Sequence, residues 1–298
     1  MANPRFAGLL ATTAKLLATM LATTIVLLGT SAPTRAAETA EELVSQGLQL
    51  IQQGKVDDAV GQFQRAAQVN PQFFPAQYNL GLALRQQGKL QESATAFYNA
   101  IVADPNFPTT YANLGAALLE GNNLKQAKEY LQQALKLDPK LGIAHYNLGL
   151  VLALQGDNAG AIEAFKKANE FTSQAPEPYY HLGLAYQRDR WNRGAIAAFR
   201  KAIQLNPTYP EALYSLGSLL YSEGQFEEAL DAFRKTTQAN SNYTPAYYAA
   251  GLTLIKQKKY SEAKQVLQFA KEQYLQRKNQ SWADKTAQVL QQLQTISP

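Results

Sequence analysis

The sequence contains no cysteine and only two histidines, His145 and His181. Without cysteine, the chain can form no disulfide, no thiol nucleophile and no thiolate metal site. The two histidines leave little material for a histidine-based metal site or a catalytic triad. The glycine-rich phosphate loop, the H-E-x-x-H zinc motif and the G-x-S-x-G nucleophile motif are absent as well. We therefore expect a protein that is not an enzyme and that uses no cofactor and no metal.

Acidic residues are missing from the first 37 positions. Three basic residues occur there: Arg5, Lys15 and Arg35. Residues 16–28 form an apolar run that is short for a membrane span, which needs about 20 residues. The small residues Ala36 and Ala37 close the segment. This order predicts a cleaved Sec-type signal peptide over residues 1–37, and hence export to a periplasm, to a thylakoid-type lumen or out of the cell.

Two other interpretations of this segment remain open. Residues 6–28 are nearly continuously apolar if Lys15 is tolerated, which favours an uncleaved membrane anchor. A leader without acids and rich in alanine and threonine is also typical of an organelle transit sequence. Loss of the leader would lower the formal net charge from +5 by three. Because a nearly neutral array lacks a basic stripe, RNA binding is the weaker hypothesis and we expect no nucleic-acid partner.

Glycine marks an internal repeat. Seven glycines follow one another at intervals of 34 residues, without insertion or deletion: Gly47, Gly81, Gly115, Gly149, Gly183, Gly217 and Gly251. With this glycine at position 8, the repeats start at residues 40, 74, 108, 142, 176, 210 and 244. A fixed period of this length is typical of repeat architectures, in which one small unit of structure is stacked many times.

The other recurrent positions predict two helices in each repeat. Positions 4, 7, 8 and 11 lie on one face of a first helix, and positions 20, 24 and 27 lie on one face of a second. Positions 20 and 27 are mostly alanine, and position 24 is phenylalanine or leucine. Small residues at positions 8 and 20 let the helices approach closely, while the large residue at position 24 fills the space beside them. Proline at position 32 ends the second helix in four repeats.

The turn between the two helices is expected at position 15. Four repeats have glycine there, which turns at little steric cost: Gly54, Gly88, Gly156 and Gly224. Repeat three has its glycine one residue early, so its turn glycine is expected at Gly121. Repeats five and seven have Arg190 and Lys258 at position 15.

This pattern resembles the tetratricopeptide repeat family. The resemblance covers residues 40–277 and implies an all-α fold, a right-handed α-solenoid of seven helix-turn-helix repeats. We assign residues 38–277 to this array. After it, apolar residues continue at helical spacing, at Trp282, Val289, Leu290 and Leu293. They predict a capping helix and tail over residues 278–298.

In this family the first helices line a concave face, so the resemblance implies a groove at positions 2, 5, 6, 9, 12 and 13. Tyrosine at position 5 offers a large flat surface with a polar tip. Asparagine at position 6 can pair with both the donor and the acceptor of a peptide backbone. Leucine at position 9 adds an apolar stripe. The candidate partner-binding residues are Tyr78, Asn79, Leu82, Asn113, Tyr146, Asn147, Leu150, Tyr180, His181, Leu184, Tyr214 and Tyr248.

The resulting hypothesis is a scaffold for protein–protein interaction. It would bind an extended, apolar or aromatic-rich segment of a partner protein in the groove, in the role of an assembly factor for a larger complex. Packing within the array is the rival interpretation of the tyrosines and asparagines. The alternative function is a self-associating structural component, because acids gather at the start of the array and bases between Lys256 and Lys278.

Overall fold

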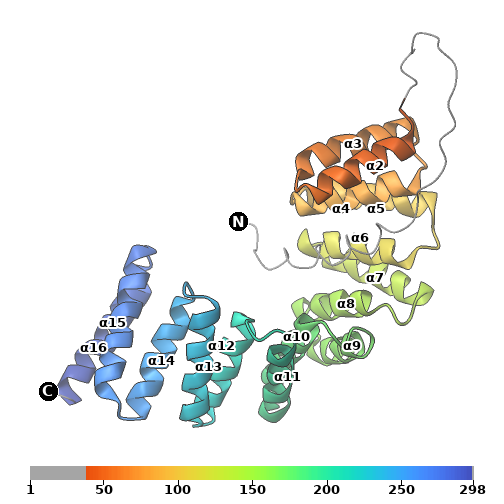
Figure 1. The fold of residues 1–298 in the computed structure, drawn as a ribbon. Helices are drawn as coiled ribbons and strands as arrows, with labels where there is room; N and C mark the ends of the chain where they lie inside the picture. Colours follow the sequence, from red (N-terminus) through yellow and green to blue (C-terminus); the bar gives the residue numbers. More distant parts are fainter. Residues whose placement is uncertain (1–37, 297–298) are drawn as a thin grey trace, which may run out of the picture. The chain divides into compact units, whose positions relative to one another are not determined.

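The computed structural model describes residues 38–296 (Figure 1). The described residues form fifteen helices, α2 to α16, and no strand, so the predicted all-α fold is confirmed. None of these helices is both long and apolar enough to cross a membrane. Residues 1–37 lie outside the described part, and the signal, anchor and transit interpretations of that segment stay predictions.

The helices alternate in a strict register. The first helices begin every 34 residues: α2 (Ala40–Gln52), α4 (Phe74–Gln86), α6 (Pro108–Glu120), α8 (Gly142–Leu154), α10 (Pro176–Arg188), α12 (Pro210–Ser222) and α14 (Thr244–Lys256). The second helices are α3 (Val56–Val69), α5 (Leu90–Ala103), α7 (Leu124–Leu137), α9 (Asn158–Phe171), α11 (Asn192–Leu205), α13 (Phe226–Ala239) and α15 (Tyr260–Gln276). Helix α16 (Gln280–Ile296) follows them.

The chain divides into two compact units. Unit 1 ends at Gln155 and unit 2 begins at Gly156, between the two helices of the predicted fourth repeat. In unit 1 the hairpins α2–α3, α4–α5 and α6–α7 stack one after another, and α8 packs against α6 and α7. In unit 2 helix α9 packs against α10, the hairpins α10–α11, α12–α13 and α14–α15 follow, and α16 packs against α15.

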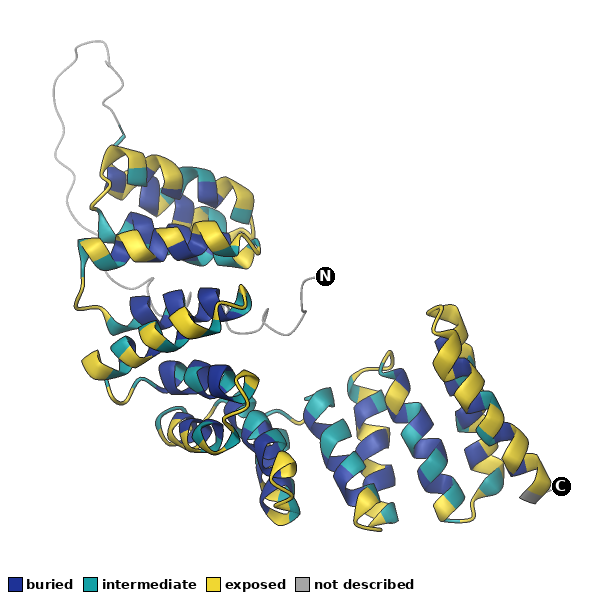
Figure 2. Ribbon diagram, turned by 180° about the vertical axis from the view of Figure 1, so that it is seen from behind, coloured by how far each residue is buried: buried dark blue, intermediate teal, exposed yellow. Residues whose placement is uncertain are grey.

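In each hairpin that lies within one unit, a glycine of the first helix faces a large side chain of the second helix. A Cβ atom on Gly81 would lie 2.7 Å from ring atoms of Phe97, and one on Gly183 would lie 2.5 Å from Phe199. Both phenylalanines are fully buried. Figure 2 shows the buried faces of the helices turned towards their neighbours and the exposed faces turned outwards. The predicted contact between positions 8 and 24 is therefore the physical reason for the 34-residue glycine period.

The turn of repeat three contradicts the prediction. Gly121 has a φ of −77°, an ordinary backbone conformation, and it ends helix α6. The left-handed residue is Asn122, with a φ of 61°. Asparagine visits this conformation more readily than most residues because its short polar side chain can bond locally. Arg190 (φ 58°) and Lys258 (φ 61°) adopt the same conformation at the same position of their repeats.

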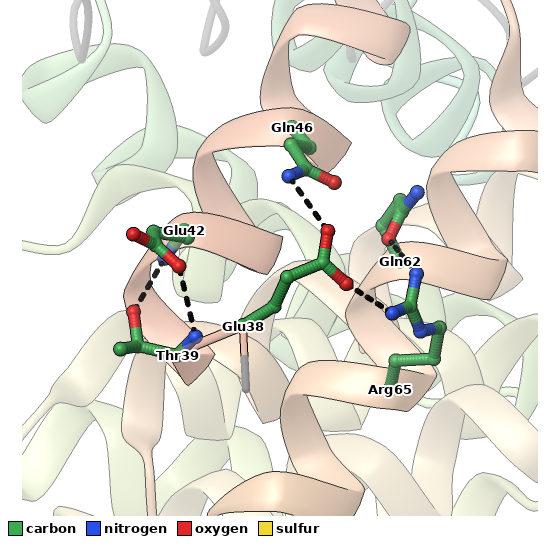
Figure 3. A network of polar contacts seen from close by, with 6 residues as sticks. All are labelled: Glu38, Thr39, Glu42, Gln46, Gln62 and Arg65. Atoms are coloured by element: carbon green, nitrogen blue, oxygen red, sulfur yellow. Dashed lines mark hydrogen bonds and ion pairs between the residues drawn. The ribbon is translucent and has the colours of Figure 1, made fainter. Parts of the chain in front are cut away.

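A network of polar contacts caps the amino end of α2 and links it to α3 (Figure 3). The backbone N–H of Glu42 donates to Oγ1 of Thr39 at 3.2 Å, and the N–H of Thr39 donates to the Glu42 carboxylate at 3.0 Å. This capping box satisfies amides that a helix start leaves unpaired. Glu38 accepts a hydrogen bond from Nε2 of Gln46 at 3.3 Å and forms an ion pair with Arg65 on α3. The residues that flank α2 therefore hold its first turn in place.

Candidate partner-binding surface

The first helices form the inner side of unit 1. Helix α2 contacts α4, α4 contacts α6, and α6 contacts α8. The second helices α3, α5 and α7 approach one another less closely. A stack whose layers are closer together on one side curves towards that side. Within unit 1, the concave face is therefore built by the first helices, where the resemblance placed it.

The tyrosines at position 5 are used mainly inside the array. Tyr146, Tyr180 and Tyr248 are buried, and Tyr78 and Tyr214 are half-buried. The largest effect of this setting on Tyr78 is desolvation, which raises the pKa of its hydroxyl, while a hydrogen bond from Asn113 opposes that rise. Since the ring faces pack within the protein, these tyrosines do not offer the open flat surface that the sequence predicted.

The residue that covers three of these five tyrosines was missed by the sequence analysis. It is the last residue before the next first helix, at position 34 of the repeat. The ring of Phe107 lies 5.8 Å from that of Tyr78, and the ring of Tyr209 lies 5.2 Å from that of Tyr180. Tyr243 lies 5.1 Å from Tyr214 in the same way. A recurrence of aromatic residues just before the first helices was the available signal.

The asparagines at position 6 differ in accessibility. Asn79 and Asn113 are half-buried, whereas Asn147 is only 4% exposed. Nδ2 of Asn79 donates to the carbonyl oxygen of Pro75 at 2.7 Å, and Nδ2 of Asn113 donates to the Tyr78 hydroxyl at 3.0 Å. Each contact uses one amide proton and holds the side chain in place. The carbonyl oxygen and the second amide proton of Asn79 and of Asn113 are left for another molecule.

The leucines at position 9 form a stripe that is only partly open. Leu82, Leu150 and Leu184 are half-buried. Leu82 and Leu150 pack against the hydrophobic core of unit 1, which includes Leu114 and Val151. Part of each side chain therefore belongs to the packing between repeats. The exposed part of each leucine side chain adds a small apolar area to the concave face, which is less than the fully exposed stripe that was expected.

An aromatic cluster lies beside the two accessible asparagines. The rings of Phe74 and Tyr78 are stacked, with centroids 5.4 Å apart. Phe107 contacts both, at 5.0 Å from Phe74 in an edge-to-face arrangement. Phe107 remains 39% exposed although it is large and apolar. Because Asn113 bonds to Tyr78 and Phe107 contacts Tyr78, the Asn113 amide and the exposed aromatic surface are adjacent.

An ion pair tightens the same face of unit 1. Nε of Arg85 on α4 donates to the carboxylate of Glu120 on α6 at 2.9 Å. The two side chains are only 12% and 13% exposed. Because removing two charges from water is costly, such a pair needs good geometry to persist. It joins neighbouring first helices at the far end of the face from the aromatic cluster.

The two histidines have packing roles. A ring nitrogen of the buried His145, Nε2, lies 2.8 Å from the carbonyl oxygen of Pro139. Gln77, at the same position of its repeat, donates to the equivalent carbonyl of Pro71 at 3.1 Å. The ring of His181 stacks on Phe165. Among the described residues, no group of histidines and carboxylates could hold a metal ion.

Two family models match the sequence. Residues 44–108 and 113–176 match the model described as "Tetratricopeptide repeat". Residues 190–270 match the model described as "Anaphase-promoting complex, cyclosome, subunit 3". No curated protein matches the chain.

Solved structures with the same fold are numerous. The chain resembles one from the APC/C hetero-tetramer Cut9–Hcn1 with a TM-score of 0.64 and 20% identity, over 74% of this chain and 44% of that chain. The chain thus spans less than half of that relative, and at this identity the likeness shows the fold alone.

Two smaller relatives are more similar in sequence. YrrB, described as "a TPR protein with an unusual peptide-binding site", has 26% identity and a TM-score of 0.55, with 64% of this chain and 99% of that chain covered. The MamA protein has 29% identity and a TM-score of 0.52, with 56% and 91% covered.

Proposed function

Since the chain carries tetratricopeptide repeats, we propose that it is a non-enzymatic scaffold that binds an extended segment of a partner protein on the concave face of unit 1. The fold of stacked helical hairpins is one of protein–protein interaction, and we assign the chain a role in assembling a larger complex. The site consists of Phe74, Tyr78, Phe107, Asn79 and Asn113.

One observation carries the proposal. Asn79 and Asn113 are each held by a single hydrogen bond, and each keeps an acceptor oxygen and a donor proton for another molecule. An extended backbone alternates N–H and C=O groups, so an amide side chain can bond to both. The exposed ring of Phe107 contacts Tyr78, to which Asn113 is bonded, and supplies an apolar contact. This combination fits an extended segment with an aromatic or aliphatic side chain close to its bound backbone.

One of the similar solved structures supports the proposal that this chain binds a peptide segment. YrrB is described as having a peptide-binding site, and it shares 26% of its residues with this chain over the matched part. The remaining candidates from the sequence contribute less. Tyr146, Tyr180 and Tyr248 are buried, and Asn147 is almost fully enclosed. We therefore confine the site to α4, α6 and the residue before α6.

The test is an affinity capture with the full chain. Wild type is compared with Asn79→Ala/Asn113→Ala and with a matched control, Gln126→Ala/Gln132→Ala, whose two amides are exposed on the second helix α7. We expect the groove variant to lose at least one partner that the control retains, with a drop of about tenfold or more in affinity for two backbone contacts. Identical partner lists for all three proteins would contradict the proposal.

A further inference from the structure

The turns between the first and second helices of unit 2 lie next to one another along one edge. Nδ2 of Asn192, at the start of α11, donates to the carboxylate of Glu223 in the following turn at 2.5 Å. Nζ of Lys259, in the last turn, lies 3.9 Å from the carboxylate of Glu227. These contacts join three successive turns. We define the turn edge of unit 2 as residues 188–193, 223–227 and 256–259.

An exposed tryptophan stands on this edge. Trp191 is 52% exposed, although it is the largest apolar side chain type. Its ring contacts Tyr186 edge to face, with centroids 4.3 Å apart. A Cβ atom on Gly194 would lie 2.4 Å from the same ring, so the glycine makes room for it. The indole is therefore held against the first turn of α11 with about half of its surface in water.

The acids of the turn edge accept hydrogen bonds or form an ion pair, whereas four of its bases form no ion pair within residues 38–296. Asp189 accepts a hydrogen bond from Asn158, and Glu223 and Glu227 are engaged as described above. Four exposed bases form no ion pair with any described residue: Arg190, Arg193, Lys256 and Lys258. The edge thus combines a fixed tryptophan with an excess of positive charge, six bases against three acids.

Two of these bases occupy an unfavourable backbone conformation. Arg190 and Lys258 have φ values of 58° and 61°, at the position where four other repeats have glycine. Glycine adopts this conformation without steric cost, whereas a side chain with a Cβ does not. A strained residue at a surface turn points to a role for its side chain. Here the two strained side chains are both basic.

The equivalent turns of unit 1 lack this combination. Lys55 and Lys89 follow turn glycines, and the third turn has Asn122 and Asn123. No exposed tryptophan accompanies them among the described residues. Lys55 and Lys89 are exposed, so they offer a matched pair of basic turn residues for comparison.

We propose that the turn edge of unit 2 binds the surface of an anionic lipid membrane. Lysine and arginine near such a surface are attracted to its negative potential. Tryptophan prefers the headgroup level, where its ring is apolar and its N–H stays hydrated. The bases lie in the first and third of the three turns, on either side of the turn that carries Glu223 and Glu227, and they are not gathered in a pocket. Positive charge at two separate places along one edge fits a broad anionic surface better than a single acidic side-chain cluster.

The experiment uses the fluorescence of Trp191 in the full chain. The protein has two tryptophans, so the Trp282→Phe variant leaves Trp191 as the reporter. It is mixed with vesicles of phosphatidylcholine alone, or of phosphatidylcholine and phosphatidylglycerol, with brominated acyl chains as quenchers. We expect quenching of Trp191 in the anionic vesicles and little in the neutral ones. Quenching of this residue reports the contact of the turn edge itself, whatever the first 37 residues do.

Two variants in the same background test the assignment. Arg190→Glu/Arg193→Glu should abolish the quenching, while Lys55→Glu/Lys89→Glu makes the same change of charge in unit 1 and should retain it. The reciprocal protein, Trp191→Phe with Trp282 as reporter, should show little quenching. Circular dichroism checks that each variant is folded. Absence of Trp191 quenching in anionic vesicles, or equal quenching after both charge reversals, would overturn the proposal.

A further arm separates lipid from acidic protein. Polyglutamate is titrated into the Trp282→Phe variant without vesicles. A shift of Trp191 emission with polyglutamate, together with no quenching by anionic vesicles, would replace the membrane by an acidic polypeptide as the ligand. This experiment does not involve the concave face of unit 1, so its failure leaves the scaffold proposal untouched.

Discussion

Units 1 and 2 share a 34-residue frame but hold neighbouring repeats together in different layers. In unit 1 the ion pair between repeats, Arg85 with Glu120, joins first helices and is almost buried. In unit 2 the ion pair between Arg200 and Glu228 joins second helices and is more than half exposed. The pair between Arg234 and Glu262 repeats that contact one hairpin later. One repeated backbone thus allows polar contacts of very different strength.

This difference agrees with the surfaces proposed for function. Unit 1 has its exposed aromatic surface and accessible amides on the inner helices, which the buried ion pair joins at their other end. Unit 2 has its exposed tryptophan and an excess of bases on the turn edge. Because the frame supplies the fold, side chains outside the shared core are free to differ between repeats. The following variants are designed to test how far this contrast holds.

The largest effect is expected for the buried ion pair. Arg85→Ala leaves the Glu120 carboxylate with little water and no partner, which should destabilise unit 1 by about 3 kcal/mol. Arg200→Ala should cost less than about 1 kcal/mol, because both partners are exposed and screened. Urea denaturation with hydrogen exchange of α4, α6, α11 and α13 measures both. The double variant Arg85→Ala/Glu120→Ala should lose less unfolding free energy than Arg85→Ala, because no unpaired charge is left. Equal losses for Arg85→Ala and Arg200→Ala would contradict the difference between the two units.

A smaller contrast is expected for two tyrosine hydroxyls. The hydroxyl of Tyr274 in unit 2 is buried without a hydrogen-bond partner among the described residues. The hydroxyl of Tyr78 in unit 1 accepts a hydrogen bond from Asn113. Tyr78→Phe should therefore destabilise unit 1 by about 1 kcal/mol, whereas Tyr274→Phe should leave unit 2 unchanged or more stable. Denaturation midpoints at neutral pH measure the difference, and a greater loss with Tyr274→Phe would contradict it.

The same tyrosine predicts a pH dependence of unit 2. Burial, with smaller contributions from Tyr214 and Tyr248, raises the pKa of Tyr274 to about 12, and Arg277 opposes the rise. In the unfolded chain the phenol ionises near a pKa of about 10. The unfolded state therefore loses this proton first, and the contribution of Tyr274 to stability declines as the pH rises from about 10 through about 12. In Tyr274→Phe this part of the alkaline loss should disappear.

The smallest effect is expected at the left-handed residues outside the proposed site. Lys278 lies just after the end of α15 in unit 2 and has a φ of 55°. Asn122 lies in unit 1 and has a φ of 61°. Lys278→Gly should stabilise unit 2 by up to about 1 kcal/mol, because glycine removes the steric conflict. Asn122→Gly should change little, since asparagine already tolerates this conformation. Thermal unfolding of both variants beside wild type measures the two effects, and a gain confined to Asn122→Gly would reverse the interpretation.

Much of the fold could be predicted from the glycine period. Gly81 and Phe97 illustrate the reason, since a close contact that recurs in each hairpin within a unit constrains the residue type at both positions. The turn in repeat three could not be placed by residue type, because Asn122 accepts the conformation for which Gly121 was the expected residue. The candidate residues of the concave face differ in how far the structure covers them. Asn79 and Asn113 lie on the concave face with free bonding capacity, whereas the tyrosines are covered by residues such as Phe107 and Tyr209.

The sequence by itself determined the helical hairpin, its period and the side chains that close it, because these depend on contacts repeated within each 34 residues. The tertiary structure decided which of the remaining side chains are covered. Arg85 and Glu120 are 35 residues apart, in adjacent repeats, and their burial exists only after the hairpins have stacked. Helical periodicity assigns a residue to a face, but the neighbouring repeat determines whether that face is open to a partner or closed.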